Sequence, residues 1–375
     1  MKENSRIYLE IFLISLLIFL PKWICSYYFF PNEDLLIKTL LDIKDVHYFL
    51  NVISFSNFDL TPSFNEFIEA KKIITFPFFS IMIHSFFYKI IGYSSFIFLE
   101  LLFIFFSILI FFKILKKLEL NKAYSLLVVA IYFSLPFILN TLNIINLSQV
   151  SILQNLVSDF IGSRFPRPLV TNIFLLLGIY FLIKLQKELI EKRTPKSIIS
   201  ISVIMALQIN SFFYFFLIQG ISTIILLIIY KKKSLFKYIL NHNKLIIKSL
   251  FIGSIGLIIF LLQSFVGEGD YSNRMSVIFI DFSDKIFLIK YFFSNLLRTE
   301  VIIFIVISLS LFFYIKKTFN RKNNQINLFI IFIISSFLST IFFILLSSKI
   351  ISLYQFVNIF LFSFVLFIFI SIILI

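Results

Sequence analysis

The chain has a single cysteine, Cys25, among its 375 residues. One thiol excludes an intramolecular disulfide and every metal site built from several cysteines. Glycine and proline are scarce, with eight of each, and only 14% of the residues are charged. Apolar residues are abundant: 60% of the chain is hydrophobic, 55 residues are phenylalanine, and the mean hydropathy is +1.01. Water-soluble globular chains do not have this composition, so the sequence predicts an integral membrane protein.

Acidic residues are the scarcer charged class, with 19 against 34 lysines and arginines, a net charge of +15. Such a balance occurs in nucleic-acid-binding proteins, but the positive-inside rule explains it better because the bases are clustered. We therefore expect no nucleic-acid partner. Of the 34 bases, 21 fall in five clusters, at Lys2–Arg6, Lys113–Lys122, Lys184–Lys196, Lys231–Lys248 and Lys316–Lys322.

If every basic cluster is cytoplasmic, the chain crosses the membrane an even number of times between successive clusters. The first apolar run is too long for a signal peptide and lacks a cleavage site, so we expect it to remain as an anchor. The predicted location is the bacterial inner membrane, with the amino terminus in the cytoplasm. Ten spans are predicted, at 7–30, 94–112, 123–141, 169–185, 197–210, 212–230, 247–266, 298–315, 326–347 and 353–375.

The expected fold is all-α, a single transmembrane helical bundle over residues 1–375 with no soluble domain. The apolar segment Ile73–Gly92 would disturb the charge pattern if it crossed, so we expect an interfacial or re-entrant helix there. The two spans of Ser197–Tyr230 are short and joined by a tight turn near Asn210. The predicted outer segments are 31–93, 142–168, the turn near Asn210, 267–297 and 348–352.

The first outer segment is rich in acids. Seven of the nineteen acidic residues lie between Pro31 and Ala70, and Glu33 and Asp34 directly follow the first span. A carboxylate there can deprotonate an acceptor hydroxyl, or Asp34 can hold a divalent ion such as Mg²⁺ or Mn²⁺ against a phosphate. The two side chains share a site only if the backbone is irregular, which Pro31 permits. The alternative is that they offset a helix dipole.

The second candidate is SDFIGSRFPRPLVTN, from Ser158 to Asn172. Arg164 and Arg167 lie on a predicted outer segment, where positive-inside sorting does not account for them. The guanidinium group matches phosphate oxygens, and the neighbouring prolines would hold it stiffly. Asp159 is a weaker candidate in the same segment. The alternatives are ion pairs with the acidic first segment and binding of lipid headgroups.

Weaker candidates lie in the later outer segments. Arg274 and Lys349 could also contact a donor phosphate, and Tyr271 and Tyr354 could contact other parts of a substrate. The three histidines have no metal-ligand spacing.

The layout of the chain resembles the GT-C class of membrane glycosyltransferases: an acid pair directly behind the first span, a long outer segment with an interfacial helix, short paired spans and the RFPRP re-entry. More narrowly, the stretches FFPNEDLL, FSNFDLTPSF, IHSFFYKIIG, SRFPRP and SFFYFF resemble those of bacterial membrane proteins of surface-polysaccharide synthesis. The resemblance implies transfer of a sugar from a polyprenyl-phosphate donor to a glycan or lipid acceptor at the outer face. It implies that Asp34 or Glu33 is the general base and that Arg164 and Arg167 bind the donor phosphate. We expect no soluble carboxy-terminal domain, and in this the chain would depart from fuller members of the class.

Three other functions remain open. A flippase or transporter of lipid-linked oligosaccharide would have repeated halves and charges inside its spans, where Glu100 is nearly the only acid. An O-antigen polymerase would place its catalytic charges in later outer segments such as 267–297. A non-catalytic partner in a glycan-assembly complex is the third alternative.

Overall fold

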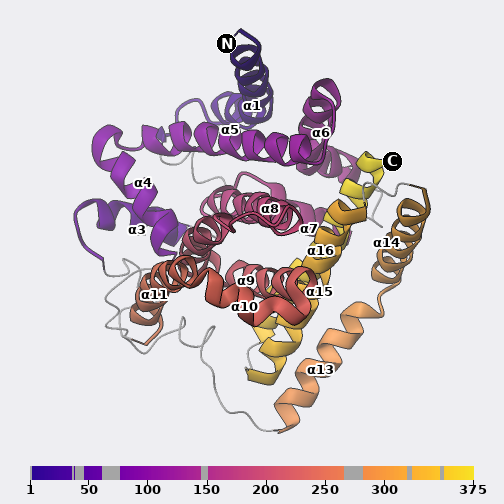
Figure 1. Cartoon of the computed structure of the whole chain (residues 1–375). Helices are drawn as coiled ribbons and strands as arrows, with labels where there is room; N and C mark the ends of the chain where they lie inside the picture. The colour runs from indigo at the N-terminus through magenta and orange to yellow at the C-terminus, as the bar shows by residue number, and fades with distance from the viewer. Residues whose placement is uncertain are drawn as a thin grey trace. The chain divides into compact units, whose positions relative to one another are not determined.

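The structure is a computed structural model, and it describes residues 2–35, 38, 46–60, 77–144, 151–265, 282–318, 323–346 and 350–375. Within these ranges every regular element is a helix, as the composition predicts (Figure 1). The elements are α1 (Lys2–Phe29), α3 (Val46–Ser56), α4 (Phe78–Ile91), α5 (Ser94–Lys117), α6 (Lys122–Ile144), α7 (Ser151–Ile161), α8 (Leu169–Ile190), α9 (Ser197–Lys231), η4 (Lys232–Ser234), α10 (Leu235–Asn241), α11 (Asn243–Phe265), α13 (Phe282–Leu296), α14 (Thr299–Thr318), α15 (Asn323–Leu346) and α16 (Ile350–Leu374).

Nine helices in the described part of the chain are long and apolar enough to cross a membrane. They are α1, α5, α6, α8, α9, α11, α14, α15 and α16. The protein is therefore a multi-pass membrane protein in an apolar bilayer environment, as predicted. The nine correspond to the ten predicted spans, because α9 contains two of them.

Helix α4 is the short apolar helix of the segment predicted to lie at the interface. Its 14 residues extend about 21 Å, which is less than the hydrocarbon core of a bilayer. Gly92 ends the helix with a φ of 60°, a left-handed conformation that glycine adopts without strain. Helices α4 and α5 are therefore separate elements.

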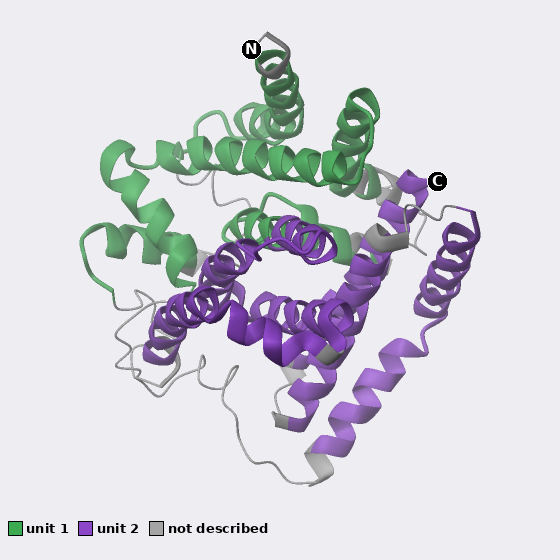
Figure 2. Cartoon of the chain, viewed as in Figure 1, with its two compact units in different colours: residues 1–177, 266–268 green, residues 178–265, 269–375 purple. Residues whose placement is uncertain are grey.

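The helices form two compact units, divided within α8 (Figure 2). Unit 1 comprises Met1–Leu177 and Val266–Glu268, and unit 2 comprises Gly178–Phe265 and Gly269–Ile375. In unit 1, α5 packs against α1, α4 and α6, while α3 packs on α4 and α7 on α6. Leu99, Ile108 and Leu115 of α5 are fully buried. Helix α5 is thus the centre of unit 1.

Unit 2 contains a helix that folds back on itself. At Phe212 of α9 the backbone leaves the helical region, with φ −158° and ψ 83°. A Cβ atom built on Gly220 would lie 3.2 Å from the terminal methyl of Met205. In a straight helix these residues would be about 22 Å apart along the axis. Helix α9 is therefore two half-helices joined by a reversal, close to the turn predicted near Asn210.

The reversal returns the chain to the end of unit 2 from which it came. The Gln186 side chain near the end of α8 donates a hydrogen bond to the Tyr230 hydroxyl near the end of α9, at 2.9 Å. Lys231 Nζ reaches the Leu189 carbonyl at 3.4 Å. The basic clusters before and after α9 therefore lie at one end of the unit, as the positive-inside rule requires.

Candidate functional site

The predicted acid pair lies just beyond the end of α1. Residues 31–34 form an irregular turn, in which the Glu33 N–H donates to the Phe30 carbonyl at 3.3 Å. The Lys38 N–H donates to the Asp34 carbonyl at 3.1 Å. Both acidic side chains are exposed. The backbone at Glu33 and Asp34 is not helical. The two side chains are therefore not forced apart by helical geometry and meet the predicted requirement for sharing a site.

Lys38 ties this turn to α1. Its side chain is only 5% exposed, its ammonium donates to the Pro31 carbonyl at 3.3 Å, and it lies 4.4 Å from the centre of the Tyr27 ring. The Ser26 hydroxyl donates to the Lys38 carbonyl at 3.3 Å. The acid pair is thus carried on a turn that is held at both ends.

The predicted arginine segment connects α7 to α8. Arg164 Nε donates to the Arg167 carbonyl at 3.0 Å, and its Nη2 lies 3.9 Å from Asp159 Oδ1. Phe165, between the arginines, is 7% exposed and its ring centre lies 4.0 Å from that of His84. Phe165 also packs against Phe96 of α5, with 6.0 Å between the ring centres, and so anchors the segment to α4 and α5. Both arginines are half-buried.

The acid pair and the arginine segment lie at the same end of unit 1. Glu10, early in α1, pairs with Lys122, the first residue of α6, at 3.0 Å. Both helices run away from that pair, and the later parts of both line one cavity, together with Ser163 beside Arg164. The acids that follow α1 and the arginines that precede α8 are therefore on one face, whichever way the protein is oriented in the membrane.

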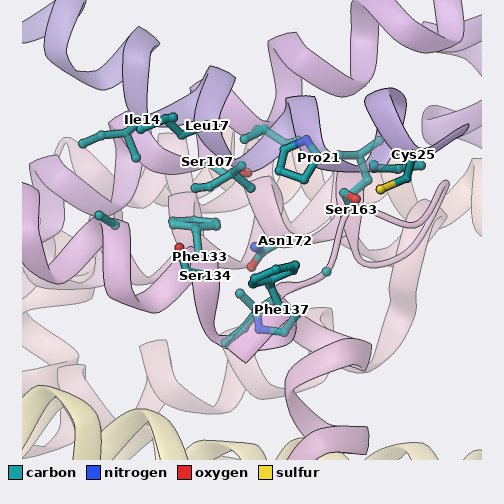
Figure 3. A pocket seen from close by; sticks show the side chains of 18 residues that line it. Ile14, Leu17, Pro21, Cys25, Ser107, Phe133, Ser134, Phe137, Ser163 and Asn172 are labelled. Atoms are coloured by element: carbon teal, nitrogen blue, oxygen red, sulfur yellow. The ribbon is translucent and has the colours of Figure 1, made fainter. Parts of the chain in front are cut away.

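The cavity has a volume of about 530 Å³ and lies between α1, α5, α6, the end of α7 and the start of α8 (Figure 3). Its wall is mainly apolar. None of the predicted site residues that the structure describes lines it. Its polar lining residues are Lys22, Cys25, Ser107, Ser134, Ser163 and Asn172.

Lys22 belongs to a buried ion pair. Its ammonium lies 2.8 Å and 2.9 Å from the two carboxylate oxygens of Glu100, and Trp23 Nε1 donates to the same carboxylate at 3.1 Å. The Glu100 side chain is 6% exposed and that of Lys22 is 32% exposed. Both residues lie in candidate spans, where an ionised group is costly unless it is paired.

The remaining predicted residues fall elsewhere. Tyr354, on α16 in unit 2, is 41% exposed. Tyr271, Arg274 and Lys349 lie outside the described residues. The described residues contain no group of three or more His, Cys, Asp or Glu side chains that could hold a metal ion. A metal at Asp34 would therefore need ligands from the substrate or from residues outside the described ranges.

Sequence reasoning missed Lys22 and Asn172. Lys22 carries a charge inside the first apolar run, and such a residue usually has a named partner within the bundle. Glu100, the acid noted inside another span, is that partner. Nothing in the sequence singles out Asn172 as a site residue, because a single amide side chain near the start of a span is common.

No protein-family model, curated protein or solved structure matches the chain. The functional inference therefore depends on the residues and their arrangement.

Proposed function

We propose that the protein is a glycosyltransferase that transfers a sugar from a polyprenyl-phosphate donor to a surface or lipid-linked glycan at the outer face of the bacterial inner membrane. The observation that carries this proposal is the placement of an exposed acid pair and an arginine segment at one end of unit 1. The amino terminus is then cytoplasmic, together with the basic residues around Lys122.

The acids suit activation of an acceptor. Asp34, with Glu33 as the alternative, would take the proton from the attacking hydroxyl. Its turn is held on α1, so the carboxylate has a defined height above the membrane.

The arginines suit stabilisation of the leaving group. A polyprenyl phosphate that departs from the sugar needs positive charge more than a proton. The Nε bond of Arg164 to the Arg167 carbonyl and the approach of its Nη2 to Asp159 hold its guanidinium within the segment. The planar guanidinium group matches the geometry of two phosphate oxygens.

The flippase alternative is supported by one observation, the Lys22–Glu100 pair inside the membrane-spanning region. Ionisable residues in spans often mark a transport path. The pair is satisfied by Trp23 and buried beside the core of α5, an arrangement that also serves packing alone. We therefore keep transport as the second candidate.

Binding of polyprenyl phosphate, the product shared by every such donor, tests the proposal without knowledge of the sugar. We expect the purified protein in lipid nanodiscs to gain thermal stability with added polyprenyl phosphate. Arg164→Ala should remove most of that gain. The matched control is Arg193→Ala, which removes an exposed arginine paired with Glu191 in a basic cluster. Equal shifts for both variants would contradict the assignment.

A further inference from the structure

We propose that the cavity of unit 1 binds a lipid alcohol, with its apolar chain along the cavity wall and its hydroxyl group on Asn172. Neither Arg164 nor Arg167 lines this cavity, and the inference does not depend on sugar transfer. A volume of about 530 Å³ is within the usual range of small-molecule sites.

The rim of the cavity indicates entry from the bilayer. Leu17 of α1 and Phe137 of α6 both line it, and they are 72% and 67% exposed. Both lie on candidate spans, so their exposed faces contact lipid chains rather than water. A ligand that enters between them must itself be apolar along most of its length.

The charge of the cavity favours an uncharged headgroup. Lys22 is the cationic residue of the cavity lining, but its ammonium is bound to both carboxylate oxygens of Glu100. The pair has no net charge, so it offers little attraction to a phosphate. Lys22 lies seven residues before the end of α1, about 10 Å along the helix from Phe29. Burying an additional anion at that depth would have a large desolvation cost.

Asn172 supplies the polar contact. It is 4% exposed, and its side-chain oxygen Oδ1 is buried without a hydrogen-bond partner in the structure. Figure 3 shows its amide among the residues that line the cavity. A buried carbonyl oxygen without a partner is destabilising, and a hydroxyl donor would satisfy it. A fully ionised phosphate has no hydrogen to donate, whereas an alcohol has one.

Cys25 makes the proposal testable, because it is the only thiol of the chain and lines the cavity. In nanodiscs, farnesol should slow the alkylation of Cys25 by a membrane-permeant maleimide several-fold. Farnesyl phosphate, which has the same chain, should protect far less. The readout for each variant is the ratio of its own rates with and without lipid.

Two variants alter the cavity by different means. Asn172→Leu keeps the size of the side chain and removes the acceptor, so farnesol should bind about three- to tenfold more weakly. Its thermal stability should equal or exceed that of the wild type, which separates lost binding from misfolding. Ala130→Phe fills the cavity and should abolish protection. Ala123→Phe, at an exposed position of the same helix, is the matched control and should retain it.

Two results would overturn the proposal. Equal or stronger protection by farnesyl phosphate would show that the site takes an anionic lipid. Unchanged protection in both Asn172→Leu and Ala130→Phe would show that farnesol acts by partitioning into the bilayer. The proposed transferase has its own test in the Arg164 thermal shift, so either proposal can fail while the other holds.

Discussion

The ammonium of Lys22 on α1 lies 2.8 Å and 2.9 Å from the two carboxylate oxygens of Glu100 on α5. Seventy-eight residues separate the two along the chain. The pair joins the first span to the central helix of unit 1, and Trp23 completes the hydrogen bonding of the carboxylate. It thereby fixes the register of α1 against α5.

Replacing one partner of this ion pair should destabilise the protein more than replacing both. Glu100→Gln leaves the Lys22 charge without its counter-ion, and we expect a loss of about 2 kcal/mol, below the usual cost for a buried pair because Lys22 is one-third exposed. The double variant Lys22→Met with Glu100→Gln should recover most of that loss. Unfolding in detergent for both single variants and the double variant measures the coupling. Additive losses would show that the two residues act independently.

Two glycines of α11 should respond in opposite ways to alanine. A Cβ atom at Gly256 would lie 2.6 Å and 2.7 Å from the Cβ and Cα atoms of Ala206 on α9, whereas Gly253 has no atom within 4 Å. Gly256→Ala must therefore separate the helices and weaken the bond from the Asn210 side chain to the Gly256 carbonyl. We expect it to lower the melting temperature by several degrees.

Gly253→Ala is the matched control on the same helix. It gains helix propensity without a clash, so stability should stay equal or rise by up to about 1 kcal/mol. Equal destabilisation by the two substitutions would contradict the close approach of α9 and α11.

His84 should make stability depend on pH. It lies on α4, outside the candidate spans, is 1% exposed, and its Nδ1 bonds to the Ser80 carbonyl at 3.0 Å. Burial lowers the pKa of His84 from 6.5 to about 3, although the Ser80 bond opposes the shift. Between these values the unfolded chain binds the proton and the folded chain does not. Stability should therefore fall as the pH drops below about 6.5.

The free energy of unfolding should change by at most about 1.4 kcal/mol per pH unit between pH 6.5 and 3. His84→Phe keeps an aromatic ring beside Phe96, Phe103 and Phe165 and removes the titration. Urea titrations at several pH values compare the two proteins. If the variant shows the same slope as the wild type, other groups cause the pH dependence.

Much of the fold follows from hydropathy and charge. Apolar runs of sufficient length predict the spans, and the basic clusters on either side of residues 197–230 require a hairpin there. The structure places its reversal at Phe212, two residues beyond the predicted turn near Asn210. Gly92 separates α4 from α5, in agreement with an interfacial helix in that segment.

The cavity was not predictable, because it depends on how helices distant in sequence pack. In a hydropathy profile Lys22 is one charged residue in an otherwise apolar span, and Asn172 does not stand out. Only the packing of α1 against α5 shows that Glu100 neutralises Lys22, and only the positions of α6 and α8 show that Asn172 faces the space left between them. By contrast, the same-face placement of Asp34 and Arg164 follows from counting spans.

The central claim is that Asp34 and Arg164 serve one transfer reaction. The most direct measurement is the rate at which purified protein in nanodiscs releases polyprenyl phosphate from a panel of polyprenyl-phosphate sugars, with an acceptor extract from the same membranes. We expect Asp34→Asn to reduce the rate at least about a hundredfold, with Glu300→Gln, an acid in the first turn of α14, retaining wild-type activity. Undiminished transfer by a folded Asp34→Asn protein would contradict the claim.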